Sequence, residues 1–282
     1  MISILIGWCI IGIYSYLYGR TVISILYKER EHVLKSVDIA VVSGFVFLNI
    51  FAQFFSIVYK VGMFAFVVVS VGAIVCLFYL WKKDILAIRT GQKHNAKMSM
   101  RTILTGVAII GTLLWTNVVP QHYDTYLYHA QAIHWIEEYA VVPGLGNLHF
   151  RLAYNSAFMT LQALFSFAWL NGQSMHIVNG FIVLSMMIYG VCTFHRNERE
   201  LLQVSDFLKI GMIFYLLYTS IYISSPNTDI CALLLLFYVC IKWSEFSEQE
   251  ISSALPYSFL SLLCVYAVTV KLSVAIFVIL VI

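Results

Sequence analysis

Residues 120–155, PQHYDTYLYHAQAIHWIEEYAVVPGLGNLHFRLAYN, interrupt a chain that is otherwise a series of apolar runs. This segment gathers ionisable side chains between two hydrophobic stretches: Asp124, Glu137, Glu138, His122, His129, His134, His149 and Arg151. Ionisable groups are costly in hydrocarbon, so a chain of this kind places its chemistry where the apolar pattern stops. We therefore expect the chemistry of this protein in and around this segment.

The composition indicates that lipid surrounds much of the chain. Of the 282 residues, 61% are hydrophobic and only 11% are charged, whereas about 25% is usual in soluble domains. The net charge of +3 is spread between the apolar runs and does not indicate a nucleic-acid partner. The six cysteines all lie in apolar runs without CxxC spacing, which favours small buried side chains over redox or metal roles.

Apolar runs of about 20 residues predict membrane-spanning helices. The candidates are 2–19, 39–59, 61–81, 102–119, 175–193, 207–223, 230–244 and 256–270, and a further run, 272–282, is still apolar at the chain end. We expect an all-α, polytopic transmembrane helical bundle of about eight or nine spans, with juxtamembrane helices in a large outer loop. We divide it into N-terminal helices with a basic loop (1–101) and a membrane module (102–282). We also expect that the sequence is a fragment of a longer protein or that its last helix is cut short.

Positive residues predict the orientation of the bundle. Segment 28–38 carries Lys28, Arg30 and Lys35, and segment 82–101 carries six further lysines and arginines. Both segments indicate the cytoplasmic side, so the turn at Lys60 and the loop 120–155 are expected outside.

The apolar run 156–170 leaves two topologies open. It is short for a span and lies between polar residues, which favours an interfacial or re-entrant helix. Arg196, Arg199 and Lys209 then fall on the cytoplasmic side, and Asp124, Asp229 and Lys271 all fall outside. If the run crosses instead, the loop with Arg196 and Arg199 lies outside and the turn 224–229 inside.

Asp124 directly follows an apolar run. Its carboxylate can accept a proton from a hydroxyl or hold a divalent cation beside a phosphate, but an aspartate here also suits a helix N-cap. His129 and His134 are five residues apart, a weak spacing for a metal site on one helix face. A structural zinc is thus the weaker alternative to histidines that hydrogen-bond locally, and Glu137-Glu138 indicates a solvated face.

Other polar residues also have two interpretations. Residues 142–147 form a Pro/Gly turn without Walker spacing. His149 and Arg151 would share a face of an extended segment and could grip a phosphate, or Arg151 could extend to lipid headgroups. Thr228 or Asp229 is expected to cap the next helix. Lys271 lies at a helix interface or is paired with an acid or a bound anion.

The arrangement resembles the GT-C superfamily of integral-membrane glycosyltransferases, in particular its aminoarabinose-transferase and protein O-mannosyltransferase branches. The resemblance covers about residues 100–282 and rests on Asp124 after a span, on aromatic juxtamembrane segments, on Thr228-Asp229 and on the Lys271 region. The strongest part is the pattern D-x3-YH…VPGL-N-H-R-x3-N within 124–155, which is similar to a bacterial group of GT-C-like membrane proteins. In contrast to the best-known members, three spans precede the loop, and the C-terminal helices and soluble domain of many members are missing.

This resemblance implies an inverting transfer of a sugar from a polyprenyl-phosphate donor to a glycan or lipid acceptor, outside a bacterial inner membrane. Asp124 would be the catalytic base. The implied substrate-binding residues are His129, His149, Arg151, Asn155, Asp229 and Lys271. No cofactor is implied with certainty, and a divalent cation stays open.

Three other classes stay open on the residues alone. A polysaccharide polymerase or ligase would rely on arginine and histidine rather than on an acid. A transporter or flippase would show inverted repeats and charges near the bilayer midplane, and the sequence indicates neither. A non-enzymatic membrane scaffold is the third of these classes.

Overall fold

The computed structural model describes residues 1–27, 32–83, 100–194 and 202–281, and within these ranges its regular secondary structure is helical, without strands. The α-helices are α1 (Ile2–Leu26), α2 (Val37–Val58), α3 (Met63–Lys82), α4 (Met100–Thr116), α5 (Ala130–Glu138), α6 (Ala157–Leu164), α7 (Ala168–Asn171), α8 (Val178–Thr193), α9 (Val204–Tyr218), α10 (Thr228–Glu248) and α11 (Ala254–Val270). Shorter helical segments are η1 (His32–Lys35), the π-helix η2 (Thr125–His129), η3 (Leu145–Asn147), η4 (Phe150–Tyr154), η5 (Ser220–Tyr222) and η6 (Leu272–Val281). Lys28, Arg30, Arg196, Arg199 and the basic residues within 84–99 lie outside the described residues.

Four of these helices, α1, α2, α3 and α10, are long and apolar enough to cross a membrane by length and composition. Three further apolar helices, α4, α8 and α11, have 10–17 residues. The all-α prediction is confirmed, whereas the structure does not confirm a count of eight or nine spans. The helices begin where local chemistry favours it: Gln203 and Asp206 form a capping box before α9, and Pro256 sits in the first turn of α11.

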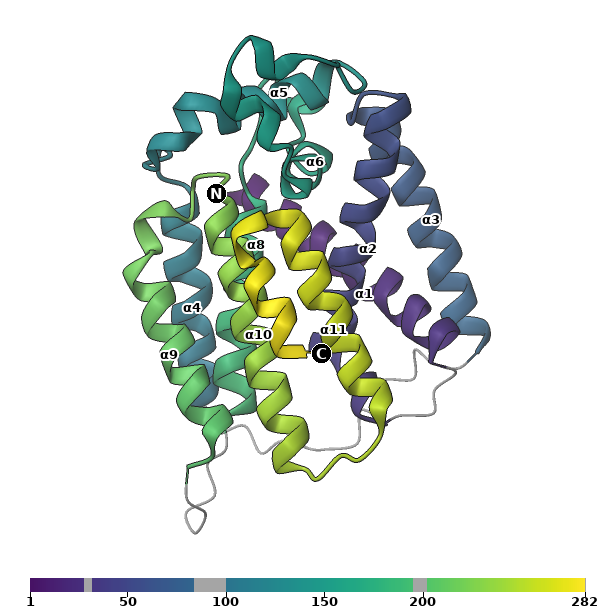
Figure 1. Ribbon diagram of the computed structural model, residues 1–282, viewed down its shortest axis with the longest axis vertical. Helices are drawn as coiled ribbons and strands as arrows, with labels where there is room; N and C mark the ends of the chain where they lie inside the picture. The colour runs from purple at the N-terminus through teal and green to yellow at the C-terminus, as the bar shows by residue number, and fades with distance from the viewer. Residues whose placement is uncertain (28–31, 84–99, 195–201, 282) are drawn as a thin grey trace.

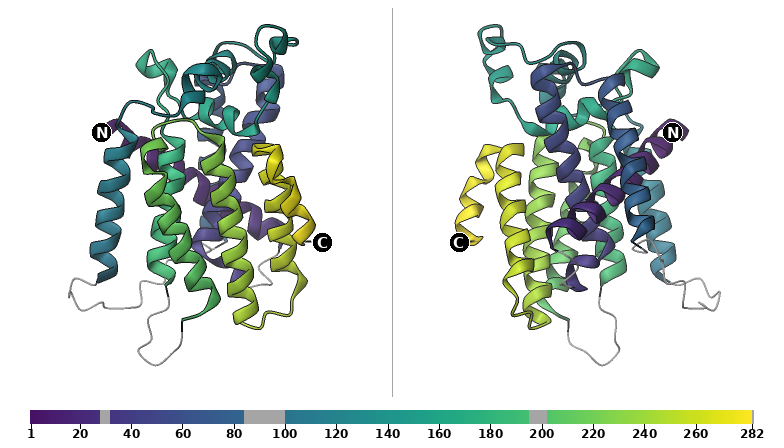
Figure 2. Two further views of the ribbon diagram at one scale, coloured as in Figure 1. Left: turned by 60° about the vertical axis from the view of Figure 1, so that its left-hand side comes forward. Right: turned by 90° about the vertical axis from the view of Figure 1, so that its right-hand side faces the viewer.

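The long helices lie side by side, and the segments between α4 and α8 gather at one end of the bundle (Figures 1 and 2). We call this the loop end. Lys60, between α2 and α3, lies there because its Nζ is 3.7 Å from a carboxylate oxygen of Glu138. At the opposite end, Arg101 at the start of α4 donates to the carbonyl of Phe194, just after α8. Lys60 and the segment 120–155 therefore share one end, as the sequence predicts.

The run 156–170 does not cross the bundle. Helix α6 has eight residues, all of them buried. Before it, the Ser156 hydroxyl donates to the carbonyl of Val270, next to Lys271; after α7, the Ser174 hydroxyl donates to Glu137 in the loop. Both flanks of the run thus lie at the loop end, which agrees with the interfacial or re-entrant interpretation and not with a crossing.

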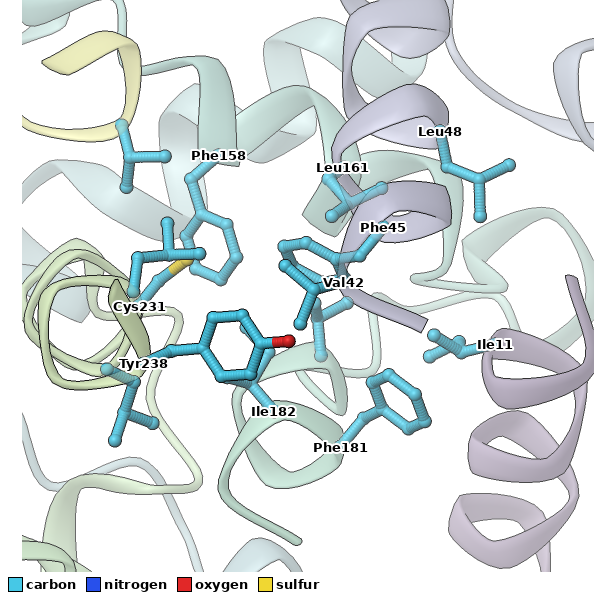
Figure 3. Close-up of a cluster of buried hydrophobic side chains, with 14 of the residues drawn as sticks. Ile11, Val42, Phe45, Leu48, Phe158, Leu161, Phe181, Ile182, Cys231 and Tyr238 are labelled. Carbon is cyan, nitrogen blue, oxygen red and sulfur yellow. The ribbon is translucent and has the colours of Figure 1, made fainter. Parts of the chain in front are cut away.

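One hydrophobic core joins residues from both halves of the chain. Figure 3 shows part of it, contributed by α1, α2, α6, α8 and α10: Ile11, Val42, Phe45, Leu48, Phe158, Leu161, Phe181, Ile182, Cys231 and Tyr238. Helices α1 and α2 cross at very close range, because a Cβ built at Gly19 would overlap the Ala40 carbonyl, and one at Gly44 would overlap that of Ser15. The core positions α6 beneath the loop segments. The division at residue 101 stays a prediction.

Toward the opposite end, α2, α9 and α10 share a network of buried ion pairs. Lys209 Nζ lies 2.9 Å from Glu245 and 3.6 Å from Asp206. Lys242 Nζ lies 2.7 Å from Asp38 and 2.9 Å from Glu245. The Lys209 and Asp206 side chains are fully buried. Lys209 is on the predicted side of the bundle, but it binds acids inside the protein rather than facing water.

Candidate functional site

Asp124 stands at the start of η2, where its side chain makes no capping hydrogen bond. Its Oδ1 instead accepts from Arg151 Nη1 at 2.5 Å, and its backbone N–H donates to His122 Nδ1. Of the two interpretations of Asp124, the N-cap is therefore wrong. Helix η2 is a π-helix, a rare geometry that is frequent at functional sites because it shifts the side chains that follow.

Arg151 is held by both charge and aromatic rings. Its Cζ lies 5.7 Å from the ring centroid of Tyr128 and 5.7 Å from that of Phe150, and its side chain is 29% exposed. Cation–π contacts and the ion pair together fix the direction of the guanidinium. Arg151 is thus not a free lipid-headgroup ligand.

His149 does not share an extended face with Arg151, because residues 150–154 form the 3₁₀-helix η4. His149 Nδ1 caps this helix by accepting from the Arg151 backbone N–H. Asn155 ends it with an exposed, left-handed backbone (φ 44°), a conformation that asparagine tolerates well. His149 and Asn155 therefore shape the turn that presents Arg151.

Asp229 and Lys271 form a second ion pair at the loop end, between Asp229 Oδ1 and Lys271 Nζ. The predicted cap at Thr228 or Asp229 is wrong, because Asn227 Oδ1 accepts from the Asp229 backbone N–H and caps α10. The Asp229 carboxylate instead lies in the first turn, near the positive end of the helix. Lys271 is therefore paired within the bundle, one of the two predicted alternatives.

Three histidines lie near these pairs. His129 is 1% exposed, and neither ring nitrogen has a hydrogen-bond partner among the described residues. Its ring stacks against that of His122, with 6.2 Å between centroids. Burial lowers the pKa of both imidazoles, that of His129 to about 4. To a smaller extent, the charge of Asp124 raises both pKa values and the charge of Lys271 lowers them. Asp124 and Lys271 thus act on the same two rings.

His176, just before α8, is the third of these histidines. Burial lowers its pKa to about 4, and its charge would lower the pKa of His129 further. All three rings therefore stay neutral at pH 7 and can each both donate and accept a hydrogen bond.

The structure gives no support for a metal site in this segment. Among the described residues, no three His, Cys, Asp or Glu side chains come together as ligands for a metal ion. His134 lies 3.8 Å from Glu137, which is buried against Ser174 rather than solvated, while Glu138 is half exposed beside Lys60. The prediction of a solvated face holds for Glu138 and is wrong for Glu137.

A cavity of about 640 Å³ opens next to the second pair. Its polar lining includes His122, Asn227, Asp229 and Lys271, and its apolar lining includes Ile230, Leu233 and Val274, with the rings of Tyr123, Tyr215 and Tyr222 between them. The cavity therefore has a charged end at the loop end and an apolar wall along α10 and η6. A ligand with an anionic head and a hydrocarbon tail would match this lining.

The segment 120–155 thus brings Asp124, Arg151 and His129 to the same end of the bundle as Asp229 and Lys271 from α10 and the end of α11. Sequence reasoning missed His122, His176 and the Tyr128 and Phe150 rings around Arg151. No signal in the chain could place His176 or Phe150, while the cluster of tyrosines and histidines in 120–129 was a usable hint for His122 and Tyr128.

A family model matches the whole chain, residues 1–282. The protein belongs to the family described as Domain of unknown function (DUF8201). No curated protein and no solved structure matches it. The family thus covers both ion pairs and the cavity, together with all the helices that position them.

Proposed function

We propose that this protein is a multi-pass membrane glycosyltransferase of the GT-C type. It would transfer a sugar from a polyprenyl-phosphate donor to a glycan or lipid acceptor. The observation that carries the proposal is the convergence of two ion pairs, Asp124–Arg151 and Asp229–Lys271, beside a cavity with a charged end and an apolar wall. Glycosyl transfer from a lipid phosphate needs three parts: a base, a cation and an apolar cavity for the lipid tail.

In this proposal the acceptor hydroxyl attacks the anomeric carbon of the donor sugar directly, which inverts that carbon. Arg151 holds Oδ1 of Asp124, and the second carboxylate oxygen takes the hydroxyl proton. The bond between the anomeric carbon and the phosphate oxygen breaks, and the electron pair leaves with the polyprenyl phosphate. Lys271 stabilises the charge of this leaving group, and Asp229 orients Lys271 beforehand.

The neutral histidines would serve the sugar and the phosphate oxygens. Of these histidines, His122 lines the cavity and would reach the phosphate oxygens, whereas His129 is enclosed and stacks against the His122 ring. A divalent cation bound with the phosphate would add to the charge of Lys271.

The proposed topology has α4, α8, α9 and α11 crossing the membrane together with the four longer helices. The loop end then faces the outside of a bacterial inner membrane, where a lipid-linked donor can reach the cavity along α10 and η6. This orientation is supported by the basic residues predicted for the opposite end.

Asp124→Asn keeps the shape of the side chain and removes its basicity, so we expect surface-glycan modification to be lost at normal protein levels. The measurement is mass spectrometry of surface glycans from a deletion strain complemented with each variant. Glu138→Gln is the matched control, since Glu138 is an exposed acid of the same loop and should leave modification unchanged.

Full modification by the Asp124→Asn variant would remove Asp124 from this role. A polysaccharide polymerase or ligase is the second candidate, favoured by the fixed position of Arg151 between two rings. In the same assay, activity lost in Arg151→Lys and kept in Asp124→Ala would select it.

A further inference from the structure

Aromatic rings surround the Asp124–Arg151 pair on the side formed by η2 and η4. Tyr128 and Tyr154 meet edge to face with 5.8 Å between centroids, and Phe150 and Tyr154 do the same at 6.4 Å. We call these three residues the aromatic rim. Phe150 is 64% exposed and Tyr154 is 61% exposed, although both are large rings.

An exposed set of rings in a membrane protein has an ordinary explanation, an interfacial anchor in the headgroup region. The aromatic rim differs from such an anchor in its order. Its rings come from two segments, pack against each other and hold Arg151 between Tyr128 and Phe150. The polar atoms at its centre, Asp124 and Arg151, are each more than a quarter exposed.

The chemistry of this surface selects one class of ligand. Ring faces bind apolar surfaces, and the carboxylate–guanidinium pair beside them accepts and donates hydrogen bonds while being neutral as a unit. A pyranose ring has the matching properties, because its C–H face is apolar, its hydroxyl edge is polar and it carries no net charge. In the proposed function the lipid phosphate lies elsewhere, at Lys271 in the cavity.

We infer that the aromatic rim is a saccharide-binding subsite that receives the acceptor sugar with a hydroxyl directed at Asp124. This inference rests on the proposed function and adds the acceptor class and its location to it. Tyr123, which lines the cavity and directly precedes Asp124, marks the boundary between the donor side and the acceptor side. Donor and acceptor then approach Asp124 from two different surfaces.

The test uses the full chain in lipid nanodiscs without any donor. Saturation-transfer NMR is recorded with three probes: methyl α-glucopyranoside, methyl β-galactopyranoside and methyl N-acetyl-β-glucosaminide. At least one probe should receive saturation at its ring C–H protons, and Phe150→Ala with Tyr154→Ala should weaken its binding about tenfold. Phe150→Trp should retain binding, since it keeps a ring face.

Two control variants separate the possible explanations. Tyr139→Ala removes another exposed aromatic ring of the loop end, one that packs on Trp135, and should leave binding unchanged. Glu138→Gln removes an exposed charge of the same loop end and should also leave it unchanged. Equal losses for Tyr139→Ala and the Phe150/Tyr154 double variant would identify interfacial anchors and overturn the subsite.

Absence of saturation with all three probes, or unchanged binding in the double variant, would also overturn it. Because the assay contains no donor and leaves Asp124 intact, its failure is distinct from failure of the proposed function. That function is contradicted by full glycan modification in the Asp124→Asn variant, whether or not the aromatic rim binds sugar.

Discussion

At the scale of single residues, the site consists of histidines that burial keeps neutral, next to charged side chains that form ion pairs. His129 is the clearest case, since it is enclosed, has a pKa of about 4 and finds no hydrogen-bond partner for either ring nitrogen in the described part of the chain. In the unfolded chain an imidazole has a pKa of about 6.5. The difference links protonation of His129 to the stability of the fold.

We expect acid to destabilise the protein partly through His129. Between pH 6.5 and 4 the unfolded state binds a proton that the folded state does not, so stability is complete above pH 6.5 and falls as the pH falls toward 4. His129→Gln does not titrate and should recover about 2–3 kcal/mol of the loss between pH 7.5 and pH 4.5. Thermal unfolding in nanodiscs at the two pH values measures this difference.

His134→Gln provides the comparison, because the His134 side chain is 64% exposed. An unfolding midpoint that falls equally with pH in the wild type and in the His129→Gln variant would contradict the burial of His129. His176, which is also buried, will keep part of the pH dependence in every variant.

At the scale of elements, apolar runs predicted where most long helices lie but not where they end. The expected 2–19 and 230–244 became Ile2–Leu26 and Thr228–Glu248, since serine, threonine and charged residues lower hydropathy without stopping a helix. The short α6 was predictable from its length and polar flanks. The π-helix η2 was not, because no residue pattern in 125–129 distinguishes it from an α-helix.

The crossing of α1 and α2 depends on glycine at two positions. We expect Gly19→Ala to force these helices apart and to destabilise the protein by about 3 kcal/mol or more, as overpacking does. Gly111→Ala on α4 is the matched control, since a Cβ there meets nothing within 4 Å. Thermal unfolding of both variants in nanodiscs compares them, and equal midpoints would contradict the close crossing.

At the scale of the whole molecule, the contacts that sequence reasoning could not find are those between distant segments. Asp124 and Arg151 are 27 residues apart within one loop, and no pattern in the sequence paired them. Asp38, Lys209 and Lys242 come from three helices, and only the packing of those helices brings them together. Charge counting therefore predicted the end of the bundle for Lys209 but not its partners.

Removing Lys209 takes one of two lysines away from Glu245 and an ion-pair partner away from the buried Asp206. Lys209→Met should therefore destabilise the protein by about 3–5 kcal/mol. Lys60→Met breaks a pair whose side chains are 43% and 50% exposed, so the loss should stay below about 1 kcal/mol. Chemical denaturation in mixed micelles measures both, and similar losses for the two variants would show that Lys209 is hydrated.

The same network bears on how the chain enters the bilayer during synthesis. Helix α9 has 15 residues and carries Asp206 and Lys209 near its start, so it is a poor candidate for independent insertion in the proposed topology. Glu245, which neutralises Lys209, lies on α10 and is synthesised later. The translocon would therefore release α9 into lipid only together with α10, as a helical hairpin. Helix α9 would stay in the translocon until α10 has been synthesised.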